Sequence, residues 1–223
     1  MEKMPYQEPD SQGPRRPLTR EQAERSEAPT SDWRTALPTL KGTLATLREL
    51  RTSDAPALLT MLSSEEVVQF VPPLPDEVGG FERFILSAHA QRMSGSYACF
   101  GVVPKGTQAV AGLFQLRQME PGFTNAEWGF AMAPEYWGTG VFLEGAKLVA
   151  DFAFDCVGVH RLEARVCARN GRGNGAMRKL GATQEGVLRR SFLRKGEYLD
   201  RVLWSILRDD WYGAKAVWGP KMH

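Results

Sequence analysis

The stretch AEWGFAMAPEYWGTGVFLEGA, residues 126–146, decides the fold of this chain. Residues 126–132 are apolar and aromatic over the length of a strand, and Pro134 ends that strand because it cannot donate to a sheet ladder. Gly138 and Gly140 permit backbone angles that a side chain would prevent, and an amphipathic helix follows. A glycine turn that leads into a helix presents free N–H groups and the positive end of the helix dipole. These features suit a phosphate or pyrophosphate.

Two familiar phosphate-binding motifs do not fit this turn. A P-loop closes with Lys-Ser or Lys-Thr, whereas Val141 and Phe142 follow Gly140. A dinucleotide-binding fingerprint needs three spaced glycines, and the third is missing. The Gly-Thr-Gly pattern is also compatible with an ordinary strand-to-helix turn that binds no ligand. The ligand therefore has to be inferred from the neighbouring segments.

Those segments repeat the arrangement of strand, glycine-rich entry and helix. HRLEARVCARN, residues 160–170, alternates apolar and polar side chains and predicts a second strand. NGRGNGAMRKLGA, residues 170–182, enters a short helix at Asn170 and stops at Gly181. This order resembles the GNAT (GCN5-related) N-acetyltransferase superfamily, and especially its RimJ/RimL-like branch, which acetylates protein N-termini. The resemblance covers roughly residues 44–211.

The residues that carry the resemblance match the family's motifs with some departures. The acyl-CoA loop of the family reads Gln/Arg-x-x-Gly-x-Gly/Ala, and here Trp137, Gly140 and Phe142 take its fixed positions. A large Phe142 would either crowd the pyrophosphate or point into the core. The second motif, Asn-x-x-Ser, keeps Asn170 but has Gly173 in place of the serine.

The resemblance implies a fold, a cosubstrate and a set of binding residues. The fold would be α/β (α+β), a single domain in which a mixed, mostly antiparallel sheet with splayed central strands is flanked by helices. Acetyl-CoA would be the cosubstrate, with no metal. The pantetheine would be bound by the backbone of Ala131, Met132 and Ala133 and by the side chain of Asn170. The pyrophosphate would be bound by the turn residues Trp137, Gly138, Thr139, Gly140, Val141 and Phe142, and a phosphate by Arg172.

Catalytic side chains are harder to predict. Glu127 and Glu163 lie on the two central strands, so each is a candidate general base, with an exposed structural glutamate as the alternative reading. Because Gly173 replaces the motif serine, Tyr198 or Ser191 on a later hairpin is a candidate proton donor to the thiolate, and water is the alternative. Glu144 is expected to pair with Lys147 along its helix.

Composition bounds the class of protein and its surroundings. A chain of 223 residues predicts one domain, 36–212, between an N-terminal extension, 1–35, that is disordered or draped, and a tail, 213–223. A net charge of +2 gives no field that favours nucleic acid or membrane, and no run is apolar enough to span a bilayer. Cys99, Cys156 and Cys167 lack metal-ligand spacing and predict reduced core thiols of a cytoplasmic protein.

Further elements follow from periodicity and turn residues. Ser53 is the expected N-cap of a helix that ends at Leu62, and Lys195-Gly196 is the expected turn of a C-terminal hairpin. The other predicted elements are strands at 43–51, 97–103, 109–118, 187–193 and 198–207. A helix is predicted at 76–93, with Phe81, Phe84, Ile85 and Ala88 on its apolar face.

Three functional hypotheses remain open at this point. The preferred acceptor is a protein or peptide N-terminal amine, and the enzymatic alternative is a small amine such as an aminoglycoside or polyamine. A non-catalytic acyl-CoA-binding module is the rival from another class. The tryptophans Trp128, Trp204 and Trp211 are predicted to be core contacts or contacts of a homodimer.

Overall fold

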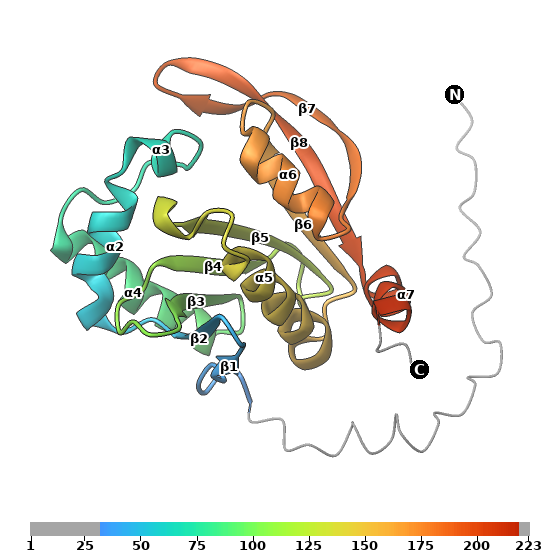
Figure 1. Cartoon of the computed structure of the whole chain (residues 1–223), viewed down its shortest axis with the longest axis horizontal. Helices are drawn as coiled ribbons and strands as arrows, with labels where there is room; N and C mark the ends of the chain where they lie inside the picture. The colour runs from blue at the N-terminus through green and yellow to red at the C-terminus, as the bar shows by residue number, and fades with distance from the viewer. Residues whose placement is uncertain (1–31, 219–223) are drawn as a thin grey trace, which may run out of the picture. The chain divides into compact units, whose positions relative to one another are not determined.

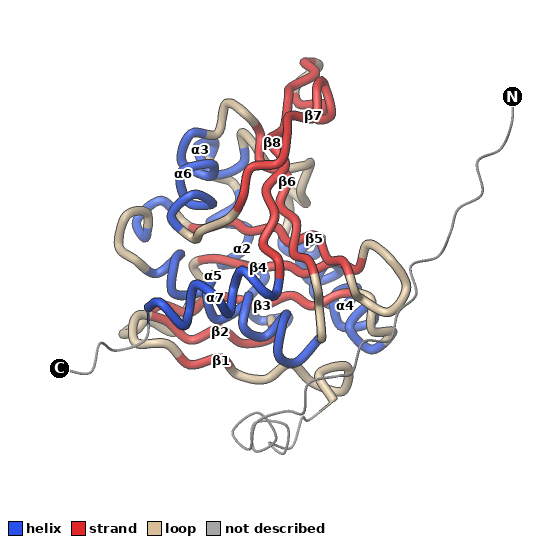
Figure 2. The backbone as a smooth tube through the Cα atoms, turned by 90° about the vertical axis from the view of Figure 1, so that its right-hand side faces the viewer, coloured by secondary structure: helices blue, strands red, loops and turns tan. Residues whose placement is uncertain are grey.

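The computed structural model describes residues 32–218, which form a single eight-stranded sheet with helices on both faces (Figures 1 and 2). The predicted extension therefore lies outside the described residues up to position 31. The strands are β1 (Leu40–Lys41), β2 (Ala45–Glu49), β3 (Tyr97–Pro104), β4 (Gly112–Gln118), β5 (Asn125–Met132), β6 (Arg161–Cys167), β7 (Thr183–Arg194) and β8 (Glu197–Leu207). The α-helices are α2 (Ala55–Leu62), α3 (Glu65–Val68), α4 (Val78–Met93), α5 (Val141–Asp151), α6 (Gly171–Lys179) and α7 (Arg208–Trp218).

The sheet is mixed and mostly antiparallel, as predicted. Its strand order is β1-β2-β3-β4-β5-β6-β8-β7, and the β5–β6 pair alone is parallel. That parallel ladder spans three residue pairs, from Asn125 opposite Arg161 to Glu127 opposite Glu163. β6 stays paired with β8 as far as Cys167, and β5 stays paired with β4 as far as Met132. The two central strands therefore splay apart beyond Glu127, and a gap opens between their carboxyl ends.

Two hydrophobic cores cover the two faces of the sheet. The core on the α5 side includes Trp128 and Trp204 on the sheet and Trp211 on α7, each no more than 3% exposed, so the predicted core role of these tryptophans is confirmed. The core on the other side joins α2 and α4 to β3 and β4, with Phe81 and Ile85 fully buried as their helical spacing predicted. On that side the clustered apolar core ends at β5, and the polar sheet face continues on β6 with Arg161, Glu163 and Arg165.

Trp33 extends the domain upstream of the predicted boundary at residue 36. Its indole is 7% exposed and packs edge-to-face against Phe123 and Phe152. At the other end, α7 runs past the predicted boundary at residue 212. Ordered structure is therefore described on both sides of the predicted range, and the boundaries themselves stay a prediction.

Several local predictions need correction. Asp54, not Ser53, stands before α2, and its carboxylate accepts from the Arg51 amide at 2.8 Å and from the Arg48 guanidinium at 2.7 Å. Cys99 and Cys167 are buried, but Cys156 is exposed, because the helix widens into a π-helical turn, Phe152–Val157, that turns this residue outward. The short helix α3 was not predicted, since four residues are too few to show helical periodicity.

Candidate active site

The glycine turn lies where the sheet splays. A 3-10 turn, Pro134–Tyr136, follows β5, and α5 begins at Val141 with Gly140 as its N-cap. Gly138 has φ +77° and Gly140 has φ +91°, the left-handed region that the sequence predicted for these positions. The first amides of α5 have no acceptor within the helix, so they and the positive end of the helix dipole can bind an anion.

Phe142 does not point toward this turn. Its ring packs against Phe130, with 4.8 Å between ring centroids, and against Phe114 at 5.5 Å. The aromatic side chain therefore belongs to the core on the α5 side. Its size takes no space from a ligand at the helix N-terminus, which answers the question raised by the unusual residue in the loop motif.

Trp137 and Arg172 connect the two sides of the gap. The Trp137 indole N–H donates to the Met132 carbonyl at 2.8 Å. The Arg172 guanidinium, in the first turn of α6, lies over the Trp137 ring at 4.1 Å from its centroid. The structure thus brings these two predicted residues together at the mouth of the gap.

The backbone groups that face the gap follow from the alternation of the antiparallel ladder. Met119 N–H donates to Asn125 C=O, so the odd-numbered residues of β5 face β4 and the even-numbered residues face β6. Phe130 and Met132 therefore turn their amide groups into the gap, and the Met132 carbonyl is already occupied by Trp137.

Of the three residues predicted to bind pantetheine through their backbone, two point elsewhere. Ala131 pairs with Leu113 on β4, and Ala133 donates to the Ala111 carbonyl and accepts from the Tyr136 amide. The Met132 N–H keeps the predicted orientation. The Phe130 N–H, which was not predicted from the sequence, has the same orientation as the Met132 N–H, and only the strand register identifies it.

Asn170 caps α6, and its Oδ1 accepts the Gly173 amide at 2.8 Å. Its side-chain NH₂ is left as the group that could reach a ligand. A Cβ at position 173 would lie 2.8 Å from the Asn170 Nδ2 and 2.9 Å from a Val166 methyl. The glycine in place of the motif serine is therefore required by the close packing of this helix start.

Glu127 and Glu163 lie side by side on the sheet face opposite α5, each between two arginines. Glu127 contacts Arg117 and also Arg165, at 3.0 Å. Glu163 contacts Arg161 at 2.8 Å and Arg165 at 3.2 Å. Their side chains are 18% and 13% exposed. Both candidate bases are thus engaged as anions in one charged network.

The network continues to the edge of the sheet. Arg161 also contacts Glu185 at 2.5 Å, and the Ser205 hydroxyl donates to Glu185 at 2.6 Å. These two contacts, the Arg161 guanidinium first, lower the pKa of Glu185 to about 2. Glu185 is therefore held ionised by its partners.

Tyr198 is separated from both glutamates. It is 61% exposed, and strand alternation places it on the same side of the sheet as Val202 and Trp204, which is the α6 side. The structure therefore brings Glu127 and Glu163 together but does not bring Tyr198 to them.

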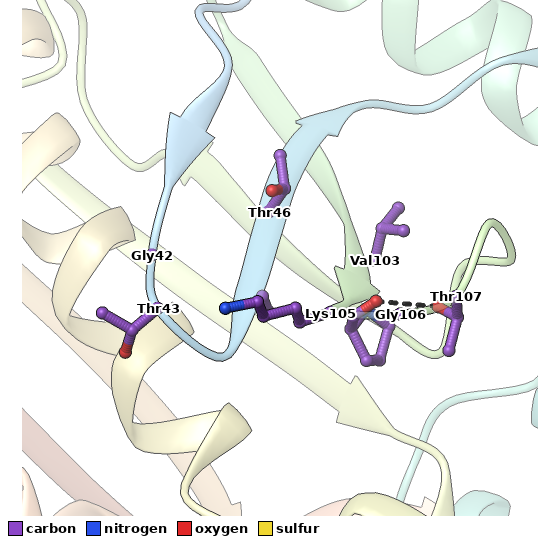
Figure 3. A pocket seen from close by; sticks show the side chains of 9 residues that line it. Gly42, Thr43, Thr46, Val103, Lys105, Gly106 and Thr107 are labelled. Atoms are coloured by element: carbon purple, nitrogen blue, oxygen red, sulfur yellow. Dashed lines mark hydrogen bonds between the residues drawn. The ribbon is translucent and has the colours of Figure 1, made fainter.

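Glu144 forms contacts that its helical spacing did not predict. Its carboxylate accepts from the Thr43 amide and hydroxyl at 2.8 and 2.5 Å, and from the Leu44 and Ala45 amides at 2.8 and 3.0 Å. It thus anchors the turn between β1 and β2 to the first turn of α5, instead of forming the predicted pair with Lys147. A hollow lies beside this turn, and in Figure 3 the Lys105 side chain extends across it toward Thr43.

A sheet that splays at its parallel pair, with a helix N-terminus suited to a pyrophosphate at the opening, is the arrangement expected from the acetyltransferase resemblance. The chain belongs to the acetyltransferase (GNAT) domain family, whose model matches residues 45–183. The family resemblance, the fold and the assignment as an N-acetyltransferase are thereby confirmed.

Curated relatives and solved structures agree with this membership. The uncharacterized N-acetyltransferase p20 of Bacillus licheniformis is 25% identical over 169 residues, which cover 75% of this chain and 95% of that protein. Spermidine N(1)-acetyltransferase of Escherichia coli (strain K12) is 32% identical over 92 residues, 41% of this chain and 50% of that protein. The ribosomal-protein-S5-alanine acetyltransferase of Vibrio fischeri shares the fold, with a TM-score of 0.71 at 20% identity over 78% of this chain and 98% of that one.

The described residues contain neither a metal-binding cluster nor a helix that could span a membrane. Residues 32–218 contain no cluster of three or more His, Cys, Asp or Glu side chains arranged to bind a metal ion. In the same part of the chain, no helix has the length and apolar character to cross a membrane.

Proposed function

We propose that this N-acetyltransferase moves the acetyl group of acetyl-CoA to the α-amine of a protein or peptide N-terminus, by direct attack within a ternary complex. The observation that carries the choice of acceptor is the state of the two glutamates. Each carboxylate contacts two arginines, so both glutamates beside the gap are already paired, and an amine that is partly neutral in solution suits such a site. Near pH 7.4, roughly a fifth of α-amines are already neutral, but only about one lysine side chain in a thousand is.

The donor site is supported by the fit of the gap and the glycine turn. The amides at the start of α5 would receive the pyrophosphate, with Trp137, Gly138, Thr139, Gly140, Val141 and Phe142 supplying the turn and Arg172 a nearby positive charge. The Phe130 and Met132 N–H groups and the Asn170 side-chain NH₂ would bind the pantetheine arm. Acetyl-CoA, when bound, supplies a thioester whose carbonyl accepts the amine and whose thiolate departs.

Proton transfer completes the proposed mechanism. Glu127 is the first candidate to receive the proton of the attacking amine through solvent, because it lies where the parallel ladder ends, and Glu163 is the second. Tyr198, on the α6 side of the sheet, is the candidate donor to the departing thiolate. Placement of the two substrates would supply much of the remaining rate enhancement.

The relative that acts on spermidine keeps a small-amine acceptor as the second candidate, although the match covers less than half of this chain. The three free cysteines support the predicted cytoplasmic location, where a nascent or mature protein N-terminus is available.

Steady-state release of free thiol from acetyl-CoA tests the proposal directly. A short peptide with a free N-terminus, the same peptide with a blocked N-terminus and an internal lysine, spermidine and an aminoglycoside would be compared. We expect turnover with the first peptide and little with the others. Preferred use of spermidine or the aminoglycoside would refute the acceptor assignment, and acetyl-CoA binding without any turnover would indicate a non-catalytic module.

A further inference from the structure

The tip of the β7–β8 hairpin reaches across to α3. The Lys195 ammonium contacts the Glu65 carboxylate at 2.9 Å, and the Arg194 Nη2 donates to the Val68 carbonyl at 2.9 Å. Figure 1 shows the hairpin and α3 at the same end of the molecule. The polar sheet face that carries Glu127 is therefore bordered by α3 on one side and by the hairpin on the other.

Strand register places two hairpin arginines on this same face. Antiparallel partners share a face, and Arg201 lies opposite both Cys167 on β6 and Leu188 on β7. Cys167 shares its face with Arg165, two residues earlier on the strand. Arg194 lies opposite Glu197, which is four residues before Arg201 and thus on the same side of β8.

These two arginines differ from the others around the gap because no carboxylate holds them. Within residues 32–218, Arg117, Arg161 and Arg165 each contact a glutamate, whereas no ion pair is formed by Arg194 or Arg201. The Arg201 guanidinium is oriented by Ser191 instead, through the hydroxyl at 3.1 Å and the carbonyl at 2.9 Å. Burial lowers the pKa of Arg201 from its ordinary value, which leaves the group charged but poorly solvated.

Arg194 adds an unsatisfied donor. Its Nε is buried, and among the described residues it is the one buried side-chain nitrogen or oxygen without a hydrogen-bond partner. A bulge in β7 between Leu188 and Phe192 fixes Ser191, and the Arg190 amide within it donates to Asp200 at 2.7 Å. The hairpin therefore holds Arg201 in a defined orientation, with spare donors and no direct ion pair among the described residues, while the Glu127 carboxylate acts on its charge from a distance.

We propose that Arg201, assisted by Arg194, binds a carboxylate of the acceptor, so that the preferred acceptor is a peptide with an acidic side chain close to its free N-terminus. This inference rests on the proposed function and specifies its acceptor. A guanidinium forms paired hydrogen bonds with a carboxylate, and such bonds are stronger in a partly buried site. The same positive charge disfavours a polyamine.

Two pentapeptides that differ by Glu or Gln at the second position test the proposal with the unmodified protein. We expect kcat/KM to be roughly tenfold higher for the Glu peptide, the range of one charge-assisted hydrogen-bonded pair. Arg201→Gln should abolish the difference, and the matched control Arg189→Gln, at an exposed position of the same hairpin, should retain it. Free alanine is included as an acceptor, because its own main-chain carboxylate could bind Arg201 in place of the glutamate side chain. Preferred use of free alanine would overturn the assignment of a peptide acceptor.

Binding measurements keep this test separate from the proposed activity. Calorimetric titration of both peptides into the protein with CoA present requires no turnover. Tighter binding of the Glu peptide, lost in Arg201→Gln, would support the carboxylate subsite even if no acetylation occurred. Equal binding and equal kcat/KM of the two peptides with the unmodified protein would refute the subsite, whereas the activity itself would stand.

Discussion

Replacement of Glu144 by glutamine should destabilise the protein near neutral pH and much less in acid. The Glu144 carboxylate receives four hydrogen bonds from the β1–β2 turn, two on each oxygen. Glutamine keeps one acceptor oxygen and turns an NH₂ group toward two donors. Two hydrogen bonds are therefore lost, and the donors that made them face another donor.

The magnitude follows from these contacts. A net contribution of about 1 kcal/mol per hydrogen bond gives a loss of about 2 kcal/mol at this half-buried site. For a domain of this size each kcal/mol changes Tm by roughly 2–4 °C, so Tm should fall by about 4–8 °C at pH 7.

The pH dependence has a definite sign. Burial alone would raise the pKa of Glu144, but the hydrogen bonds from Thr43 and the backbone of Leu44 and Ala45 outweigh it and lower the pKa below its ordinary value of 4.5. A carboxylate with a lowered pKa in the folded state stabilises the fold fully above its unfolded pKa, and this contribution is lost as pH falls through the folded value. The Tm difference between the native protein and Glu144→Gln should therefore narrow below about pH 4.5.

Thermal unfolding at pH 7 and at acidic pH checks both statements. Glu82→Gln is the matched control, because Glu82 is exposed on α4 and forms no ion pair or side-chain hydrogen bond within residues 32–218. An unchanged Tm at pH 7, or an equal loss at both pH values, would show that these hydrogen bonds do not stabilise the turn as reasoned.

Three further predictions concern the gap and its borders. Asn170→Ala removes the cap of α6 and should lower stability by about 1 kcal/mol, measured by denaturant unfolding, with Asn170→Asp as a retained cap. Arg172→Gln should weaken acetyl-CoA binding several-fold in a calorimetric titration and should increase solvent exposure of Trp137, seen in its fluorescence. Glu127→Gln should lower kcat more than it changes acetyl-CoA affinity, and unchanged kcat would show that the proton leaves by another route.

Local backbone requirements were visible in the sequence. The positive φ angles of Gly138 and Gly140 and the stop of α6 at Gly181 follow from residues that tolerate the left-handed region. The apolar face of α4 follows in the same way from its helical spacing. Such features depend only on residues that are close together in the sequence, so the sequence alone is enough to predict them.

Features that depend on strand register were not visible. The sequence places Glu127 and Glu163 on two strands, but which arginines meet them depends on the offset of β4, β5 and β6. The same offset decides that the Phe130 amide, and not that of Ala131, faces the gap. Neither can be read from periodicity, because a shift of one residue would exchange the two faces.

The short parallel ladder also divides the sheet into two halves. Strands β1 to β5 come from residues 40–132 and pair as consecutive antiparallel neighbours, and β6, β8 and β7 come from residues 161–207. Each half of the sheet is thus contiguous in the chain, and three residue pairs join the halves. Within each half the strands pair across short connections, whereas the β5–β6 ladder has to close over the crossover that contains α5. The opening between β5 and β6 therefore lies at the boundary between the two halves of the sheet.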